Sequence, residues 1–245
     1  IATMRYELAI IQPSDEEDAF SLVVLSSVIA FFMSVLVFLL IYIFKEEIVA
    51  TLGNQEIEAW LYFIPFTMFL AGLYQTLTFW NVRKECYTAV AKSKVAQGFT
   101  TATVQVGFKF LTSSGSLILG YILGVFASCM FLFKRMVKAT PTKNGFIKKE
   151  NIFKNAKRYR KLPIYSTFGA LSDSTSLQMP VFIISKFFDM SVTGMYSLTF
   201  KVLTLPMAIM SQALTQVLFQ KVARLYNTDP EKVQFLILKI FIALL

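Results

Sequence analysis

Histidine is absent from the 245 residues, and cysteine occurs only twice, as Cys86 and Cys129. No catalytic residue, proton relay or metal ligand of this chain can therefore be a histidine. Two thiols also exclude a disulfide framework and a metal site with four cysteine ligands. The chain lacks the short motifs of P-loop NTPases, dinucleotide-binding folds, zinc metalloproteases and serine hydrolases. We expect a protein that is not an enzyme and that binds no cofactor or metal.

Charged residues are scarce at 16 %, whereas hydrophobic residues make up 56 % of the chain and include 25 Phe. A soluble domain has about 25 % charged and 45–50 % apolar residues. The mean hydropathy of +0.59 points the same way. This composition excludes an ordinary soluble enzyme and a disordered protein, and it predicts that lipid is part of the protein's solvent.

Long apolar runs follow one another along the chain, and each is close to the length of about 20 residues that crosses a membrane. A water-soluble helical bundle is the alternative, but so many successive runs argue against it. We predict an all-α integral membrane protein, a polytopic helix bundle with six complete crossings at 19–44, 59–82, 95–112, 116–133, 163–187 and 192–219.

Partial helices are expected at both ends of the sequence. Residues 1–11 are interpreted as the last turns of an earlier helix, and a seventh apolar run begins at Val233 and stops after 13 residues. The first residue is Ile1, so we interpret the sequence as an internal piece of a longer membrane protein. A true start at Met4 is the alternative.

Basic residues predict the orientation, because short loops rich in Lys and Arg stay on the cytoplasmic side. Nineteen of the 24 basic residues fall at Arg5, in loop 83–94, in loop 134–162 and in segment 220–232. Those four places alternate with connections that hold almost no positive charge. The predicted topology therefore has these segments inside, and it accounts for the net charge of +9 without a nucleic-acid partner.

The long basic loop at 134–162 divides the chain, with a helix bundle at 1–133 before it and a second at 163–245 after it. At helical spacing Phe146, Phe153 and Ala156 share one face of this loop. The spacing favours an interfacial helix that rests on anionic lipid. A solvated linker between two bundles is the alternative.

Four residues inside or beside the apolar runs are candidates for function, because a charge within a membrane helix faces a cavity, a partner or water. Lys201 lies about 13 Å into its run, and Asp173 lies about 15 Å into a run that also carries Gln178 and many Ser and Thr residues. Lys201 either lines a polar pathway or makes a structural pair. Asp173 either exchanges a proton or pairs with Lys201. Lys109 lies in the cavity or reaches the outer interface.

Smaller signals concern packing. Gly120 and Gly124 form a G-x-x-x-G pattern, preceded at the same spacing by Ser116, which permits close approach of a second helix. Trp60 and Trp80 lie near the ends of the second apolar run, where indole rings favour the membrane interface.

Several stretches resemble one family of membrane proteins in their order and spacing. The most specific is A-G-L-Y-Q-T-L-T-F-W-N-V-R-K at 71–84. The others are R-Y-E-L-A-I at 5–10, L-G-N-Q-E at 52–56, W-L-Y-F-I-P at 60–65, the segment 162–180, and Y-S-L-T-F-K-V-L-T-L-P at 196–206. Together they resemble the polysaccharide biosynthesis proteins, the Wzx-type flippases of lipid-linked oligosaccharides in the multidrug/oligosaccharidyl-lipid/polysaccharide exporter superfamily.

The resemblance implies a two-lobed carrier of which this chain holds helix two to helix nine. On that basis 1–133 is the end of the first lobe, 134–162 joins the lobes, and 163–245 begins the second. It also implies a cationic cavity in which Arg5 and Lys201 bind a lipid diphosphate. Lys201 stands where the family often has Arg, and Asp173 where it often has a neutral polar residue. Arg5 as an interfacial anchor is the alternative.

The function implied is the flipping of undecaprenyl-diphosphate-linked oligosaccharide across the cytoplasmic membrane for O-antigen, capsule or exopolysaccharide assembly. The expected partners are that glycolipid, membrane lipids and other polysaccharide assembly proteins. An ion-coupled drug exporter of the same architecture is one alternative. A non-transporting subunit or enzyme of polysaccharide assembly is another.

Overall fold

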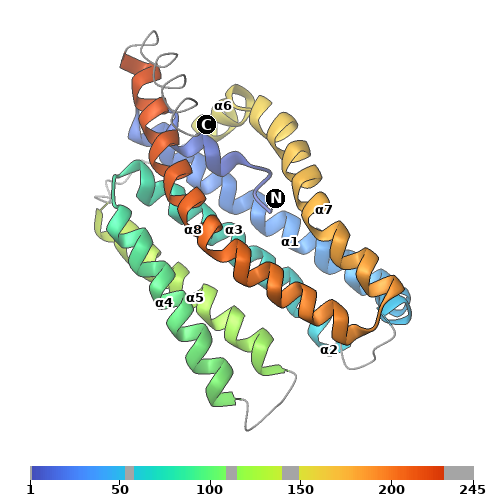
Figure 1. Ribbon diagram of the computed structural model, residues 1–245. Helices are drawn as coiled ribbons and strands as arrows, with labels where there is room; N and C mark the ends of the chain where they lie inside the picture. Colours follow the sequence, from blue (N-terminus) through green and yellow to red (C-terminus); the bar gives the residue numbers. More distant parts are fainter. Residues whose placement is uncertain (1, 53–57, 109–114, 140–148, 229–245) are drawn as a thin grey trace. The chain divides into compact units, whose positions relative to one another are not determined.

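The computed structural model describes residues 2–52, 58–108, 115–139 and 149–228. Every regular element in these ranges is helical, as the prediction of an all-α protein requires (Figure 1). The elements in chain order are η1 (Tyr6–Ile11), α1 (Glu16–Leu52), α2 (Glu58–Leu61), α3 (Phe63–Arg83), α4 (Tyr87–Phe108), α5 (Gly115–Ala139), α6 (Lys149–Arg158), α7 (Lys161–Phe187) and α8 (Met190–Thr228).

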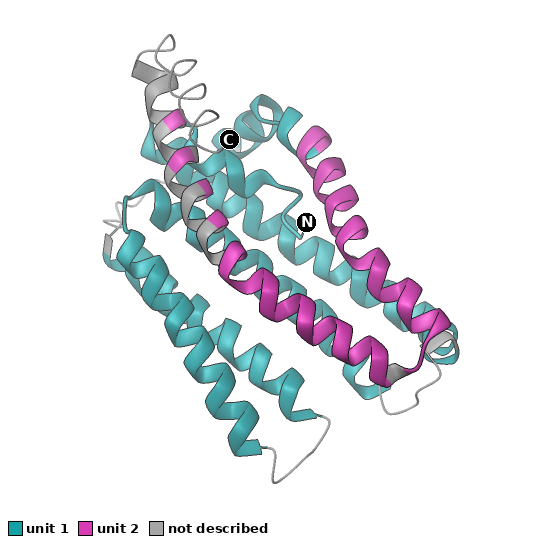
Figure 2. Cartoon of the chain, in the orientation of Figure 1, with its two compact units in different colours: residues 1–163 teal, residues 164–245 magenta. Residues whose placement is uncertain are grey.

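The chain divides into two compact units, Ile1–Pro163 and Ile164–Leu245 (Figure 2). In the first unit the long helices alternate in direction, with α3 packed against both α1 and α5 and with α4 packed along α5 (Figure 1). Helix α6 also belongs to this unit and contacts α1. In the second unit α7 and α8 are joined by a short turn at Phe188 and Asp189.

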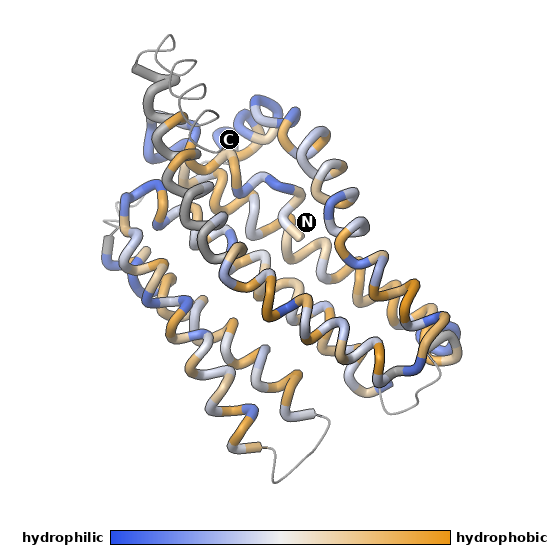
Figure 3. Tube along the Cα trace, viewed as in Figure 1, coloured by the Kyte–Doolittle hydropathy of each residue, from blue (hydrophilic) through white to orange (hydrophobic). Residues whose placement is uncertain are grey.

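Three helical stretches of the described chain are long and apolar enough to cross a membrane, namely Glu16–Ala50, Glu58–Arg83 and Gly115–Lys138. Each contains one of the predicted crossings, and apolar residues dominate them (Figure 3). Because their exposed side chains are largely Phe, Leu, Ile and Val, lipid is the solvent that suits these surfaces. The chain is an all-α membrane protein.

The three other predicted crossings lie in the more polar helices α4, α7 and α8, which have 22, 27 and 39 residues. At 1.5 Å per residue these lengths reach across a hydrocarbon core of about 30 Å. Their passage through the membrane stays a prediction, and their polarity requires that part of each surface avoid lipid.

The ends of several elements differ from the sequence-based boundaries. The prediction of a loop over residues 83–94 is wrong, because the chain leaves the helix only at Lys84–Cys86 and α4 begins at Tyr87. Lys92 and Lys94 are good helix formers, so they continue a helix past the apolar run instead of ending it. The expected loop 134–162 likewise contains the end of α5 and all of α6. A helix in this segment is confirmed as Lys149–Arg158, whereas Phe146 lies outside the described residues and contact with anionic lipid stays a prediction.

Residues 1–11 do not form the end of an α-helix. Residues 2–5 form turns in which Met4 and Arg5 have left-handed φ angles of 48° and 62°, and the short 3₁₀ helix η1 follows. Pro13 has no N–H to donate to the carbonyl three residues earlier, so the 3₁₀ hydrogen bonds stop at Gln12 before α1 begins.

Pro65 and an ion pair shape the end of the first unit at which α1 meets α2. The ring of Pro65 conflicts with the carbonyl four residues earlier, that of Leu61, and α2 ends at this residue. Helix α1 is irregular at Phe44, where φ is −103°. Beyond this point Lys45 Nζ lies 2.7 Å from Glu58 Oε1 and joins the end of α1 to the start of α2.

Small residues let α4 and α5 approach closely, as the G-x-x-x-G pattern predicts. A Cβ atom on Gly120 would lie 2.5 Å from Gln105 Cγ, and one on Gly124 would lie 2.9 Å from the Gln97 carbonyl oxygen. One turn later Ser128 Oγ donates to the Ser93 carbonyl at 3.0 Å. The pattern is therefore a packing seam between these two helices.

Candidate functional site

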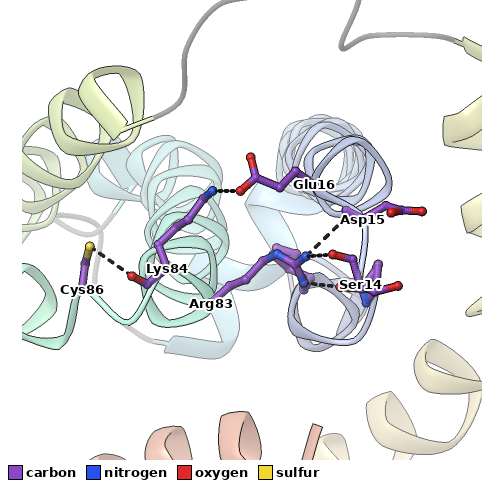
Figure 4. Close-up of polar contacts among 8 residues, drawn as sticks. Ser14, Asp15, Glu16, Arg83, Lys84 and Cys86 are labelled. Atoms are coloured by element: carbon purple, nitrogen blue, oxygen red, sulfur yellow. Dashed lines mark hydrogen bonds and ion pairs between the residues drawn. The ribbon is translucent and has the colours of Figure 1, made fainter. Parts of the chain in front are cut away.

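At the C-terminal end of α3, Arg83 binds the backbone that connects η1 to α1 (Figure 4). Its guanidinium donates to five carbonyl oxygens: those of Ile10 (3.2 Å), Ile11 (3.3 Å), Pro13, Ser14 (3.1 Å) and Asp15 (3.3 Å). A planar group with five N–H donors suits this task, whereas an ammonium group does not. Arg83 thus supplies a charged donor to the carbonyls of this irregular turn, of which that of Asp15 also accepts from the Ala19 N–H at 3.2 Å.

Neighbouring contacts complete this polar cluster. Lys84 pairs with Glu16, and its Nζ lies 5.5 Å from the ring centroid of Trp80. Trp80 is only 1 % exposed and packs edge-on against Phe20 of α1. The expectation of an interfacial Trp80 is therefore wrong, because α1 covers this side of α3.

Helix α6 is attached to the same region. Asn155, which is fully buried, donates through Nδ2 to Asp18 Oδ1 (2.9 Å) and Ser21 Oγ (2.7 Å) of α1. Tyr6 of η1 donates its hydroxyl to the Ala156 carbonyl at 3.1 Å. Burial raises the pKa of Tyr6, so the hydroxyl keeps its proton at neutral pH and remains a donor.

Arg5, the predicted ligand of the first unit, caps η1 at its N-terminal end. Its left-handed backbone costs about 1–2 kcal/mol for a residue with a side chain. Its Nε atom is shielded from solvent and makes no hydrogen bond. The residue as a whole is partly exposed.

Glu7, in the first turn of η1, is an acidic residue that the sequence interpretation overlooked. It is 3 % exposed, and it accepts a hydrogen bond from the hydroxyl of Thr3. The detectable signal was an acidic residue inside the apolar stretch at 6–11. Arg83 and Asn155 gave no comparable signal, because both stand among other polar and basic residues.

In the second unit, the middle of α7 presents polar groups around the helix. Every residue from 171 to 179 is exposed, including Asp173 and Gln178. Asp173 lies about 18 Å along the axis from the first residue of α7 at 1.5 Å per residue. Half of a hydrocarbon core is about 15 Å, so this carboxylate falls near mid-depth if α7 crosses the membrane.

Lys201 is exposed in α8, about 16 Å along the axis from Met190. Because α7 and α8 run in opposite directions, Lys201 and Asp173 have similar predicted depths. Ion pairs among the described residues join Lys45 to Glu58 and Lys84 to Glu16, and none of them involves Lys201 or Asp173. Lys201 and Asp173 are therefore not paired with each other, and each charge remains accessible.

Lys109, the remaining candidate, lies outside the described residues. Among those that are described, no group of three His, Cys, Asp or Glu side chains is placed to hold a metal ion.

The candidate groups on α7 and α8 are one carboxyl group, that of Asp173, and one ammonium group, that of Lys201. An ammonium group can bind anionic oxygens with three donors, and a carboxyl group can accept a hydrogen bond or exchange a proton.

These features define a helical membrane protein with ionisable side chains in long helices. The family described as Polysaccharide biosynthesis protein matches residues 3–244. The chain therefore belongs to the polysaccharide biosynthesis protein family, and the family resemblance inferred from the sequence is confirmed. No curated protein and no solved structure matches the chain.

Proposed function

We propose that the protein is a flippase that moves undecaprenyl-diphosphate-linked oligosaccharide across the inner membrane by alternating access. Membership of a polysaccharide biosynthesis family supports a place in glycan assembly. The observation that carries the proposal is the accessible, unpaired charge of Lys201 near the middle of α8. Such a charge is costly against lipid and useful to an anion that must pass through the bilayer.

The apolar and the polar helices would contact different parts of the substrate. Apolar surfaces such as those of α1 and α5 suit the lipid tails. The polar middle of α7 suits a hydrated glycan and its diphosphate. In this proposal Lys201 and Arg5 bind the diphosphate, while Asp173, Gln178 and Lys109 line the pathway. Asp173 is also the candidate for ion coupling, since a carboxyl group removed from water changes its proton affinity. The protein makes and breaks no covalent bond.

The test is translocation of lipid-linked oligosaccharide in proteoliposomes that contain the full-length protein, with and without a proton or sodium gradient. Lys201→Ala is expected to slow translocation at least tenfold, as loss of one charge-assisted contact of about 1.5–3 kcal/mol requires. Lys186→Ala is the matched control, because Lys186 is an exposed lysine at the end of α7 and is expected to leave the rate unchanged.

Equal rates for Lys201→Ala and the unaltered protein would remove Lys201 from the substrate path. Asp173→Asn is expected to weaken the response to one gradient and to spare movement down a substrate gradient. Absence of translocation by a folded protein would contradict the flippase proposal. Gradient-dependent export of cationic dyes would then favour a drug exporter, and inactivity in both assays would favour a subunit of the assembly machinery.

A further inference from the structure

Helix α6 has one face that is fully committed to the first unit. Asn155 is 0 % exposed and binds Asp18 and Ser21 of α1, and the adjacent Ala156 carbonyl accepts from Tyr6. These contacts place α6 at the start of the Glu16–Ala50 span, where that span begins to enter the membrane. The topology predicted from the basic residues then puts this helix at the level of the inner lipid head groups.

The opposite face of α6 combines an exposed ring with positive charge. Phe153 and Lys157 each stand two residues from Asn155, which places them about 160° around the helix from it. Phe153 is 77 % exposed, and Lys154 and Lys157 are exposed beside it. Arg158 is exposed too, but it lies about 60° around the helix from Asn155, at the edge of the attached face. An exposed aromatic ring together with long basic side chains is typical of a helix that lies at the membrane interface.

The charge of this segment is strongly one-sided. Between residues 149 and 161 the only acidic residue is Glu150. The basic residues of the same stretch are Lys149, Lys154, Lys157, Arg158, Arg160 and Lys161. Figure 3 shows α6 as a predominantly hydrophilic element. At the predicted level of α6, the head groups of anionic lipids in the inner leaflet offer a negatively charged surface to these basic side chains.

We propose that Phe153, Lys154, Lys157 and Arg158 form a docking surface for anionic phospholipid head groups. The ring of Phe153 inserts at the boundary between head groups and acyl chains, and Lys154 and Lys157 bind phosphate oxygens beside it, while Arg158 binds them from the edge of the attached face. Asn155 holds the other side of α6 against α1, so the surface is fixed to the first unit. This assignment rests on the membrane location of the chain and is independent of the transported substrate.

The experiment uses the full-length protein in nanodiscs, with a bimane probe on Phe153→Cys in a Cys86→Ser/Cys129→Ala background. Discs contain phosphatidylcholine alone or with phosphatidylglycerol, and lipids with a doxyl group near the head group quench the probe. Quenching is expected in the anionic discs, and it is expected to fall about threefold or more in phosphatidylcholine and in 1 M salt, where charge attraction is screened beyond about 3 Å.

Two charge-reversed proteins make a matched pair. Lys154→Glu/Lys157→Glu/Arg158→Glu is expected to lose the quenching. Lys134→Glu/Arg135→Glu/Lys138→Glu, which changes three exposed cations at the end of α5, is expected to keep it. Replacement of the α6 cations by Gln supplies a milder variant if the triple Glu protein does not fold.

Three results would overturn the proposal. Equal quenching in both kinds of disc would show apolar insertion without selection of anionic lipid. A probe open to acrylamide and untouched by doxyl lipid would place Phe153 in water. A probe shielded from both quenchers would show that another part of this protein, or a second copy, covers the surface.

Discussion

Arg83 illustrates how one side chain can organise an irregular backbone. Its five acceptors belong to residues 68 to 73 positions earlier in the chain. The carbonyls of the turn between η1 and α1 would otherwise have to find water at the edge of the membrane. Since unpaired polar groups are costly there, Arg83 determines the path by which the chain enters α1.

Arg83→Ala is expected to lower the free energy of unfolding by about 2–3 kcal/mol, because several carbonyls lose a charged donor. Arg83→Lys is expected to recover only part of this loss, since one ammonium cannot reach all five oxygens. Thermal unfolding in detergent, followed by intrinsic Trp fluorescence, measures both. Glu16→Gln, which breaks only the exposed pair with Lys84, serves as the control and should cost less than about 1 kcal/mol. An equal loss of unfolding free energy in Arg83→Ala and in Glu16→Gln would contradict the role of Arg83.

Asn155 acts at the same scale, on the attachment of α6. Asn155→Ala removes the donors to Asp18 and Ser21, so α6 should separate from α1 more often, at a cost of about 1–3 kcal/mol. Trypsin is expected to cut faster at Lys154, Lys157 and Arg158. Asn151→Ala, one turn earlier on the same helix, should leave the cleavage rate unchanged. Unaltered cleavage of the Asn155→Ala protein would show that other contacts hold α6.

Among the elements, α4 and α5 form the closest pair because their contact surface lacks large side chains. Gly124 faces the Gln97 carbonyl and the hydroxyl of Thr101, and Ser128 hydrogen-bonds across to Ser93. Helices in lipid gain little from apolar burial, so such close backbone contact supplies much of their attraction.

Gly124→Val is expected to push α4 from α5 and to destabilise the protein by about 1–3 kcal/mol. Gly98→Ala is the matched control in α4, since nothing lies within 4 Å of a Cβ atom at this position. It should be neutral or stabilising by up to about 1 kcal/mol, because Ala favours a helix over Gly. The measurement is the midpoint of thermal unfolding of each variant, compared with that of the unaltered protein. A Gly124→Val protein as stable as the Gly98→Ala protein would refute the packing seam.

For the whole molecule, the distribution of positive charge predicts the side of the membrane on which each helix end lies. Nineteen of the 24 Lys and Arg residues lie in the segments predicted to be inside, at Arg5, 83–94, 134–162 and 220–232. The outer connection after α1 is tied by the single pair Lys45–Glu58. Translocating basic segments is unfavourable, so this arrangement should persist in the full-length protein.

Labelling of intact cells with a membrane-impermeant maleimide tests this topology. Glu46→Cys, exposed near the outer end of α1, is expected to react, whereas Lys157→Cys on α6 should react only after the cells are opened. Both changes are made in a background without Cys86 and Cys129. The reverse pattern would contradict the orientation and would also place α6 away from the inner leaflet.

Much of the architecture could be predicted from local sequence. Apolar runs of sufficient length predict membrane helices because a lipid environment leaves the backbone no hydrogen-bond partners outside the helix. The small-residue pattern around Gly120 and the helical tendency near Phe153 are local signals too, and both were confirmed. Boundaries such as the start of α4 were missed, because a helix continues into water wherever good helix formers follow the apolar run.

The contacts of the candidate site could be predicted less well from local sequence patterns than the helices could. The sequence by itself determined which residues are charged inside long helices, and it thereby identified Asp173 and Lys201 as exceptional. Only the tertiary structure decided which polar residues are buried and with whom they bond. Arg83 meets Ile10 across 73 positions, and Asn155 meets Asp18 across 137. Such pairs depend on which helices become neighbours, and no local pattern of hydrophobicity or propensity encodes that choice.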